Sequence, residues 1–589
     1  MCGIVGFVGS CPAAPLLYDG LLKLEYRGYD SAGIATINNE IHLRKDVGAV
    51  AKIQETVDLA GLPGSIGIAH TRWATHGGVT KENAHPHLST DGAIAVVHNG
   101  IIENYQELKA ELVDAGFVFR SQTDTEIIPN LIQANFTGNL EEAIRKALSR
   151  LHGSYALLVL STHEPERVYA ARNESPLLLG LAEDGVFLAS DAMPFLHKTR
   201  DVVYLNDGEM AVVERGSVSY RDFHGKHIQK QVQRASWDAT EASLNGFKHF
   251  TLKEIMEQPV AFRQALAQDL SVVQDFADQI KKAEKTWVIA CGTSRHAGLV
   301  GKHFINRFAN ENIEVMIASE FSTFADKLKD HHFVIAVSKS GETADVLDGV
   351  RKVKANGVKV YSIVNVAGST LDRVSDKSLY LNCGPEIGVA STKSFMNQVV
   401  LFYLIGYAMD NRLQAGVETL SKLPILIQKT IDDNNEKAKA IAERIKDQPS
   451  MYYLGRGTNF AIATEGALKI KEISYIHAEG MPAGELKHGT LALISNGVPV
   501  VSINPHDYTY FDSLGNAIET KARGAFVIGV SDEPNEVFDE LFVLPKLEDD
   551  LFYPFFTVIP LQLLAYYAAV AKGNNPDKPR NLAKSVTVR

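Results

Sequence analysis

The sequence predicts a multidomain α/β protein, in which an N-terminal α+β layered domain precedes two parallel α/β domains. In the first 215 residues or so, short β runs cluster together rather than alternate with helices. Beyond residue 250, strand-like runs alternate with longer helical patterns, which is typical of parallel α/β units. A faint internal repeat, in which 287–294 resembles 452–459, indicates two copies of one unit.

The predicted domain boundaries follow these changes of pattern. Apolar periodicity weakens from Arg215 to Phe250, and we place the change of domain near Ala239. The end of the chain is rich in Pro, Asn and Lys, so we expect an irregular surface segment there. The predicted order is a first domain, a linker, two α/β domains and a tail, over 1–215, 216–250, 251–425, 426–572 and 573–589.

The composition argues against several classes of function. The net charge is −11, 45% of the residues are hydrophobic and 22% are charged, as in ordinary globular proteins. Because the chain has no block of basic residues, we expect no nucleic-acid partner and no membrane partner. Four cysteines without a pairing pattern and an N-terminus unlike a signal peptide favour a reducing compartment, so we expect a cytoplasmic protein.

Two other features have ordinary interpretations. The longest apolar stretch, Leu551–Ala571, contains two prolines and a glutamine, and we expect a helix buried in a core or interface rather than a membrane span. His85 and His87, like His331 and His332, lack the spacing of metal ligands, so we expect no metal site.

Cys2 is a candidate nucleophile, because it is the second residue of the chain. If Met1 is removed, the thiol and a free α-amine belong to the same residue, and the amine can take the proton of the thiol. The apolar residues that follow predict a buried strand, which would hold the thiol in place. Taken alone, this stretch favours a start methionine followed by an ordinary core strand.

A cluster of polar residues follows two predicted strands of the first domain. Arg72 comes after a strand that ends at Ala69, and Asn99-Gly100 comes after a strand over 93–97. An Asn-Gly pair at a strand end either forms a hairpin-type turn or supplies an amide and an N–H to an oxyanion. Together with Asp124, the guanidinium of Arg72 could hold the charged groups of an amino acid.

A hydroxyl-rich loop over 338–343 follows an apolar strand and precedes a helical pattern. Three hydroxyls, a glycine and the N–H groups of a helix N-terminus suit a phosphate monoester. Capping needs only one hydroxyl, so we favour phosphate binding over an ordinary N-cap. The stretch 291–294 also lies at a predicted strand end, where ligands of open α/β sheets bind, and is expected to face the same ligand.

Spacings of four and three residues place Glu465, Lys469 and Glu472 on one face of a predicted helix. From the spacing alone, a solvated face joined by salt bridges is the better interpretation. A polar turn that ends in His488 follows, and this histidine could transfer protons.

Together, these motifs resemble a known family. The Cys-Gly-Ile-Val-Gly start, Thr-Arg-Trp-Ala-Thr-His-Gly, His-Asn-Gly and Thr-Asp-Thr-Glu resemble class II glutamine amidotransferases. Cys-Gly-Thr-Ser, Ser-x-Ser-Gly-Glu-Thr, Gly-Val-Ala-Ser-Thr-Lys and Glu-Leu-Lys-His-Gly resemble paired sugar isomerase (SIS) domains. End to end, the chain is similar to the isomerizing glutamine–fructose-6-phosphate aminotransferases. The resemblance implies a four-layer first domain of the N-terminal nucleophile type and two doubly wound parallel SIS domains.

The resemblance also implies a reaction, in which L-glutamine and fructose 6-phosphate give L-glutamate and glucosamine 6-phosphate, the first step of hexosamine synthesis. It implies a homodimer and neither a metal nor an organic cofactor. Cys2 would attack the glutamine amide, while Asn99 and Gly100 would stabilise the oxyanion, and Trp73 matches the gate of an internal ammonia channel. The positions that match glutamine-binding residues are Arg72, Thr75, His76 and Asp124.

In the second half, Lys584 matches the lysine that forms a Schiff base with the open-chain ketose, and Glu472 matches the base that moves a proton between C1 and C2. His488 matches the group that opens the sugar ring, which in the family comes from the neighbouring subunit. Glu465 and Lys469 match positions that line this site, so the resemblance favours a catalytic helix face over a solvated one. The positions that match contacts to the phosphate or the sugar are Thr293, Ser294, Ser338, Ser340, Thr343, Val389 and Ser391.

Two residues depart from the family pattern. Lys339 stands where the family usually has glutamine, and its positive charge predicts tighter sugar-phosphate binding with a steeper dependence on salt. Arg589 stands where many relatives have glutamate, and nothing in the sequence explains this difference. The short region between the domains also lacks the long insertion of many eukaryotic relatives, so regulation through such an insertion is not expected.

Other functions account for less of the chain. An amidotransferase that serves a different ketose phosphate stays open as an alternative. A sugar-phosphate sensor would leave Cys2 unused and would come with a helix-turn-helix segment and a basic patch, neither of which is evident. A hydrolase of the N-terminal nucleophile type would leave the second half of the chain unexplained.

Overall fold

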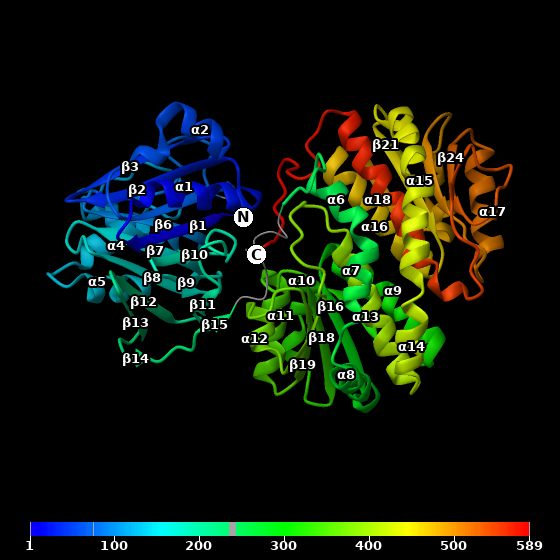
Figure 1. The fold of residues 1–589 in the computed structure, drawn as a ribbon, viewed down its shortest axis with the longest axis horizontal. Helices are drawn as coiled ribbons and strands as arrows, with labels where there is room; N and C mark the ends of the chain where they lie inside the picture. Colours follow the sequence, from blue (N-terminus) through cyan, green and yellow to red (C-terminus); the bar gives the residue numbers. More distant parts are fainter. Residues whose placement is uncertain (1, 75, 235–242, 588–589) are drawn as a thin grey trace. The chain divides into compact units, whose positions relative to one another are not determined.

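The computed structural model describes residues 2–74, 76–234 and 243–587. The chain forms two compact units, of which the first comprises Met1–Glu241 with Ala583–Arg589 and the second comprises Ala242–Leu582. Figure 1 colours the chain by sequence, so the described residues up to 234 run from blue to green and residues 243–582 run from green to red. Ala239, near which the sequence predicts the change of domain, lies outside the described residues.

Two antiparallel sheets form the centre of the first unit, in the strand orders β15-β11-β9-β10-β1-β4-β2-β3 and β14-β13-β12-β8-β7-β6-β5. The first sheet contains β15 (Gln233–Arg234), β11 (Asp201–Tyr204), β9 (Leu178–Ala182), β10 (Gly185–Ala189), β1 (Gly3–Gly9), β4 (Ile66–Arg72), β2 (Ser31–Asn38) and β3 (Glu40–Val47). The second contains β14 (His227–Ile228), β13 (Ser217–Asp222), β12 (Glu209–Glu214), β8 (Arg167–Asn173), β7 (Gly153–Ser161), β6 (Ile94–Ile102) and β5 (His87–Leu88).

Three apolar cores divide this unit into four layers. Along β1, Ile4 and Val8 belong to the core between the two sheets, whereas Val5 and Phe7 belong to the core under the helices of the first sheet. This alternation is the two-residue period of a strand that is buried on both faces. The outer layers are α1 (Ala13–Leu24) and α2 (Val50–Val57) on the first sheet, and α3 (Tyr105–Asp114), α4 (Ile127–Asn135) and α5 (Leu140–Leu148) on the second. The four-layer α+β prediction is confirmed.

The first domain extends into the segment that the sequence places in the linker. Strands β13, β14 and β15 add residues between 217 and 234 to the two sheets. Val218 and Tyr220 of β13 pack against the core between the sheets, and the backbone of β13 pairs with β12 along its length. Strand β13 is folded although it is polar, because the ladder satisfies its backbone groups and Val218 and Tyr220 anchor it to the core.

Two parallel five-stranded sheets form the second unit, in the orders β17-β16-β18-β19-β20 and β22-β21-β23-β24-β25. In both sheets the strand that comes first in the chain lies second, so the two halves share one topology and the predicted repeat is confirmed. The first half contains β16 (Lys285–Ala290), β17 (Glu314–Ile317), β18 (His332–Ser338), β19 (Lys359–Val364) and β20 (Lys377–Tyr380). The second contains β21 (Ser450–Gly455), β22 (His477–Pro482), β23 (Pro499–Ile503), β24 (Phe526–Ser531) and β25 (Glu540–Val543).

Helices cover both faces of each parallel sheet, as in a doubly wound fold. One continuous core joins the two halves through the inner helices, while separate cores lie under the outer ones. The inner helices include α6 (Phe250–Met256), α7 (Gln258–Ala265), α8 (Leu270–Lys282), α9 (Gly292–Ala309), α13 (Lys393–Met409), α14 (Leu413–Leu420), α15 (Leu423–Ile445), α16 (Thr458–Ser474) and α18 (Pro554–Ala571). The outer ones include α10 (Ala318–Ser322), α11 (Ala344–Ala355), α12 (Thr370–Val374) and α17 (Tyr510–Lys521).

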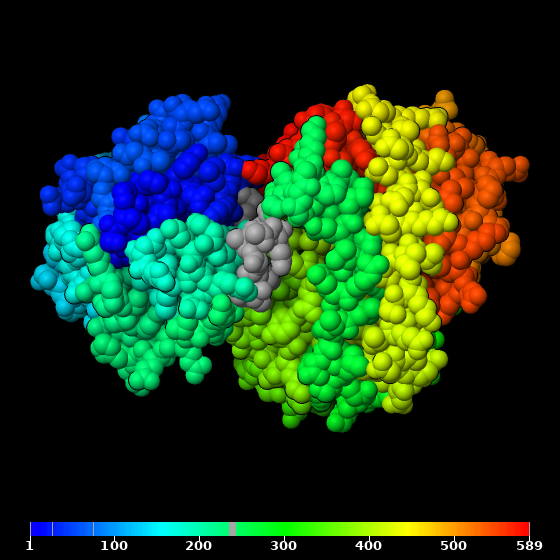
Figure 2. All heavy atoms as spheres, in the orientation of Figure 1, coloured from blue at the N-terminus to red at the C-terminus, as the bar shows by residue number. Residues whose placement is uncertain are grey.

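The long helices α15 and α18 connect the two halves of the second unit. The predicted boundary at residues 425 and 426 falls inside α15, which contacts α7 of the first half as well as α18 and β25 of the second. Figure 2 shows α15 in yellow along the visible face of this unit. Within the described residues, Asp550–Ala571 is the one helical segment long and apolar enough to cross a membrane, and 83% of its apolar window is buried inside the protein.

Candidate active sites

Cys2 directly precedes β1, and the pairing of β1 with β4 brings it beside Trp73. The Trp73 N–H donates a hydrogen bond to Cys2 Sγ at 3.3 Å, and the thiol lies 3.5 Å from the Trp73 carbonyl oxygen. Burial raises the pKa of the Cys2 thiol, although the Trp73 N–H and the Arg72 guanidinium act in the opposite direction. A thiol with a raised pKa needs a base before it can attack a substrate.

Asn99 and Gly100 lie inside a strand. Both belong to β6 and pair with β7, so the prediction of a strand that ends before His98 was wrong. Gly100 has a φ of +127°, and a Cβ at this position would lie 2.0 Å from the carbonyl oxygen of Ser154. The ladder continues through an Asn-Gly pair because glycine alone adopts this backbone conformation beside so close a neighbour.

The structure brings Asn99 and Cys2 together. Asn99 Nδ2 donates a hydrogen bond to the carbonyl oxygen of Cys2 at 3.1 Å. The other end of the amide, Oδ1, lies 3.0 Å from Nε2 of His70, a buried residue of β4. His70 was not among the predicted site residues, because its place two residues before Arg72 on an apolar strand carries no chemical signal of its own.

The guanidinium of Arg72 forms hydrogen bonds with the backbone of the loop that follows it. Its two terminal nitrogens donate to the carbonyl oxygens of His76, Gly77 and Gly78 at 2.5 to 3.1 Å. Burial lowers the pKa of the Arg72 guanidinium. The sequence predicts that Arg72 and Asp124 together bind an amino acid. In the structure, the carboxylate of Asp124 accepts the N–H of Ile102 at 2.8 Å. Met1 and the predicted glutamine contact Thr75 lie outside the described residues.

The hydroxyl-rich loop of the second unit lies between β18 and α11, as predicted. Ser338 Oγ lies 2.8 Å from Thr343 Oγ1 and accepts the N–H of Gly341 at 3.1 Å. Ser340 Oγ accepts the N–H of Glu342 at 3.2 Å. The three hydroxyls are therefore gathered around one loop that opens a helix, which is a suitable arrangement for a phosphate group.

Thr293 and Ser294 lie in the first turn of α9, after the carboxyl end of β16. Because β16 and β18 are parallel neighbours, this turn and the hydroxyl-rich loop emerge at the same edge of the sheet. Ser294 Oγ accepts a hydrogen bond from Nε2 of Gln398 at 2.9 Å. The edge predicted for a sugar phosphate thus collects hydroxyl groups from two neighbouring strands.

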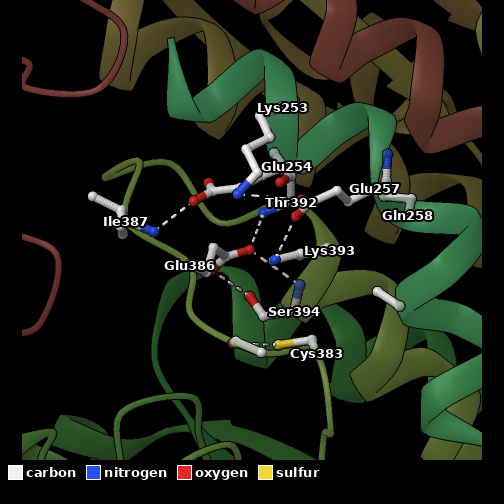
Figure 3. Close-up of polar contacts among 12 residues, drawn as sticks. Lys253, Glu254, Glu257, Gln258, Cys383, Glu386, Ile387, Thr392, Lys393 and Ser394 are labelled. Atoms are coloured by element: carbon white, nitrogen blue, oxygen red, sulfur yellow. Dashed lines mark hydrogen bonds and ion pairs between the residues drawn. The ribbon is translucent and has the colours of Figure 1, made fainter. Parts of the chain in front are cut away.

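Lys339 contacts the loop between β20 and α13, which contains the predicted sugar contacts. Its Nζ donates to the carbonyl oxygen of Glu386 at 2.9 Å. The carboxylate of Glu386 in turn accepts the N–H groups of Thr392 and Ser394 at 2.9 and 3.1 Å, and the Ser394 hydroxyl at 2.8 Å. Figure 3 shows this carboxylate bonded to Ser394 at the start of α13. Lys339 thus joins the hydroxyl-rich loop to the loop over 384–392.

Glu254 and Asp577 hold the loop over 384–392 from outside. Glu254 of α6 accepts the N–H groups of Ile387 and Gly388, as Figure 3 shows for Ile387. The carbonyl oxygen of Asp577 accepts the N–H of Val389 at 3.2 Å, and its carboxylate accepts backbone N–H groups at the start of α6. These acids lie far from the loop in sequence, so no local pattern could have identified them.

Two of the three residues of the predicted helix face are buried, and the third, Glu472, is half-buried. Glu465 is 0% and Lys469 2% exposed, because α16 packs between α9 and α18. Lys469 Nζ lies 2.7 Å from a carboxylate oxygen of Glu472, 3.5 Å from Glu465 and 3.1 Å from the Thr293 hydroxyl. The other oxygen of Glu465 lies 2.7 Å from Nδ1 of His296. The interpretation of a solvated face was therefore wrong, since spacing along a helix does not say which element covers it.

The charges in this cluster stabilise one another. Burial alone would raise the pKa of Glu465, but Lys469 and His296 outweigh it and lower that pKa. Burial alone would lower the pKa of Lys469, but Glu465 and Glu472 outweigh it and raise that pKa. Lys469 and Glu465 are therefore held in their charged forms.

No contact described above joins the predicted catalytic residues His488 and Lys584 to this cluster. His488 is exposed at the end of the short helix η5 (Ala483–His488). Lys584 is grouped with the first unit. Their roles at the sugar site stay predictions. Among the described residues, no group of three or more His, Cys, Asp or Glu side chains is arranged to hold a metal ion.

Models of two protein families match the chain. A glutamine amidotransferase domain matches residues 70–197, inside the first unit. An SIS domain matches residues 279–407 and again 444–572, which are the two repeated halves of the second unit.

Curated relatives match the chain over its whole length. The glutamine–fructose-6-phosphate aminotransferase [isomerizing] of Pyrococcus horikoshii is 46% identical over 599 residues and covers 100% of both chains. The protein of the same name from Aquifex aeolicus is 45% identical over 593 residues, again with 100% of both chains covered. The chain belongs to the isomerizing glutamine–fructose-6-phosphate aminotransferase family.

A solved structure of this family matches part of the chain. The C-terminal domain of glucosamine-fructose-6-phosphate aminotransferase from Francisella tularensis is 35% identical, with a TM-score of 0.52. The match covers 57% of this chain and 100% of that chain. The aminotransferase family thus accounts for the amidotransferase domain, the SIS repeat and their order in the chain.

Proposed function

We propose that this chain converts L-glutamine and fructose 6-phosphate into L-glutamate and glucosamine 6-phosphate, without a metal or organic cofactor. Membership of the aminotransferase family supports the reaction as a whole. The structural observation that carries the proposal is the amide nitrogen of Asn99, 3.1 Å from the carbonyl oxygen of Cys2. A fixed N–H donor beside a cysteine nucleophile is what the hydrolysis of a side-chain amide requires.

In the first step, the Cys2 thiol attacks the side-chain amide of glutamine. A bond forms between Sγ and the amide carbon, the C–N bond breaks, and a γ-glutamyl thioester and ammonia result. The α-amine of Cys2 accepts the thiol proton and passes it to the departing nitrogen, so this step requires removal of Met1. The raised pKa of the buried Cys2 thiol supports the need for such a base. Water then hydrolyses the thioester to glutamate.

Asn99 Nδ2 and the Gly100 N–H stabilise the oxyanion of the tetrahedral intermediate. Arg72, Thr75, His76 and Asp124 bind the amino and carboxylate groups of glutamine. The contacts of Arg72 with the backbone over 76–78 support this role, because they shape the loop that surrounds the substrate.

Ammonia released at Cys2 passes through the protein interior, with Trp73 as the gate. Free ammonia is mostly protonated at neutral pH, and ammonium has no lone pair with which to attack a carbon. The hydrogen bond between the Trp73 backbone and Cys2 Sγ supports a coupling between the gate and the nucleophile.

In the second unit, the hydroxyls of Ser294, Ser338, Ser340 and Thr343, together with Lys339, bind the phosphate, and Thr293, Val389 and Ser391 contact the sugar. Lys584 forms a Schiff base with the open-chain ketose, and Glu472 moves a proton between C1 and C2. The ion pair with Lys469 supports Glu472 as a base, because the cation favours the ionised carboxylate.

The active assembly is a homodimer in the cytoplasm, in which His488 of one subunit opens the sugar ring in its neighbour. Large apolar side chains are exposed near η5, namely Leu493, Phe511 and Ile518. They lie on the short helix η6 (Thr490–Leu493) and on α17, both of which contact η5, so this face suits a second subunit.

One assay tests the proposal. Purified protein is incubated with glutamine and fructose 6-phosphate, and glutamate and hexosamine phosphate are measured together. We expect equal amounts of both products. Glutamate without amino sugar would overturn the acceptor assignment and would direct the search to other ketose phosphates. The absence of both products, in protein shown by mass spectrometry to lack Met1, would overturn the proposal as a whole.

A further inference from the structure

The amide of Asn99 must point in one of two possible directions. An asparagine side chain presents either an oxygen or an NH2 group in nearly the same space. Only the NH2 group serves an oxyanion, because a carbonyl oxygen in its place would repel the developing negative charge. A flipped Asn99 would therefore remove a donor and add a repulsion.

The hydrogen bonds of His70 resolve this choice. Its Nε2 lies 3.0 Å from the carbonyl oxygen of His98 and 3.0 Å from the side-chain oxygen of Asn99. A backbone carbonyl can only accept a hydrogen bond, so Nε2 must carry the hydrogen. The atom of Asn99 that faces this N–H must then be the oxygen, which leaves Nδ2 on the side of Cys2, 3.1 Å from its carbonyl oxygen.

The surroundings of His70 keep its ring neutral and fix its position by packing. The side chain is fully buried, and burial lowers its pKa to about 3, so the ring carries a single hydrogen at physiological pH. It stacks on His85 with ring centres 4.1 Å apart and planes inclined by 12°. Nδ1 of His85 accepts the N–H of His98 at 3.4 Å, which ties the stacked ring to the strand that carries Asn99.

We propose that His70 is a positioning residue of the glutaminase site, whose neutral Nε2–H tautomer holds the Asn99 amide with its nitrogen toward Cys2. This inference rests on the proposed role of Asn99 in oxyanion stabilisation. His70 acts only through Asn99 and not on the nucleophile or the substrate directly.

Three variants of the full chain test this role. His70→Phe keeps a flat ring but removes the donor, whereas His70→Gln keeps an N–H that can reach Asn99. We expect His70→Phe to lower kcat for glutamine hydrolysis about ten- to hundred-fold, less than the loss of a whole oxyanion donor, with a KM change of less than about three-fold. We expect His70→Gln to recover most of the loss. His87→Phe is the matched control, because His87 is equally buried but bonds the hydroxyl of Thr123.

A double-mutant cycle separates positioning from a general structural role. If His70 acts through Asn99, His70→Phe should have almost no further effect on kcat in the Asn99→Ala background. An aldehyde analogue of glutamine, which forms a tetrahedral adduct with the thiol, should bind His70→Phe at least about ten-fold more weakly, while glutamate binds unchanged. If His70→Phe does not fold, His70→Asn replaces it, because its shorter amide cannot reach Asn99.

The outcomes are distinct. Additive effects in the cycle, or a kcat for His70→Phe equal to that of His87→Phe, would overturn the positioning role. A wild-type chain without glutaminase activity would instead overturn the proposed function on which the inference rests. Isomerisation of fructose 6-phosphate by each variant shows that the second unit is still folded.

Discussion

Nδ1 of His296 lies 2.7 Å from a carboxylate oxygen of Glu465, and this contact joins the two SIS halves of the second unit. His296 belongs to α9 of the first half and Glu465 to α16 of the second. The carboxylate is 0% exposed, and its other oxygen lies 3.5 Å from Nζ of Lys469. The loss of one partner of a buried charge is expensive, because the charge is then left uncompensated and away from water.

We expect Lys469→Met to destabilise the second unit by about 3–5 kcal/mol, because it leaves the buried Glu465 without its main counter-charge. The free energy of unfolding, measured by urea titration of the full chain, checks this value. Lys487→Met is the matched control, since Lys487 forms an exposed ion pair with Glu519, and its loss should cost at most about 1 kcal/mol. Equal effects of the two substitutions would contradict the role of burial.

The same substitution should reverse how stability depends on pH. In the wild-type chain the pKa of Glu465 is lowered, so its contribution is present above its ordinary pKa of about 4.3 and is lost as the pH falls through the lowered value. Without Lys469, burial raises the pKa of Glu465. The variant should therefore lose stability as the pH rises from the ordinary value through the raised one. Urea titrations between about pH 4 and pH 8 measure this slope; a wild-type-like slope would refute the prediction.

We expect Cys2→Ala to abolish glutamine hydrolysis, by a factor on the order of 10³ or more, because the nucleophile is lost. The isomerisation of fructose 6-phosphate should continue, because the residues assigned to it lie elsewhere. Glutamate release and hexose-phosphate interconversion are measured on the same preparation. Cys11→Ala is the control, since Cys11 packs against the core under the helices of the first sheet and is assigned to neither site. Loss of both activities in Cys2→Ala would show that the two sites are not separable.

Lys339→Gln should raise the KM for fructose 6-phosphate, and by more at low salt than at high salt, because it removes a cation beside the phosphate loop. The structure adds a second cause, since Lys339 Nζ also bonds the carbonyl oxygen of Glu386. Lys339→Met separates the two, because it removes both the charge and the hydrogen bond, whereas glutamine can retain the hydrogen bond. A KM that is unchanged at every ionic strength would rule out the charge effect.

The sequence predicted the layers of the fold well, because the layers follow local patterns. Short clustered strands indicated the layered α+β domain, and the similarity of 287–294 to 452–459 indicated two copies of one unit. Local patterns failed where pairing partners decided the outcome. Asn99-Gly100 has the composition of a turn but continues a strand, because β7 pairs with it and Gly100 takes a positive φ.

Some residues of the candidate sites could be predicted from motifs, whereas others could not. Cys2, Arg72, Asn99 and the loop over 338–343 stand in motifs with recognisable chemistry, so the sequence alone singled them out. Lys584 was singled out only by the family resemblance, since its spacing carries no signal. The structure describes it within the first unit, so its place beside the sugar is still a prediction.

His70, His296, Glu254 and Asp577 could not be found before the fold was known. Each acts on a partner that is distant in the chain: His296 binds Glu465 169 residues away, and Asp577 caps the start of α6 more than 300 residues earlier. The sequence by itself therefore determined which groups react and which layers of secondary structure support them. Which charge is buried, which face of α16 is covered and which end of the Asn99 amide faces Cys2 were decided by packing, because these depend on contacts between segments that no local pattern relates.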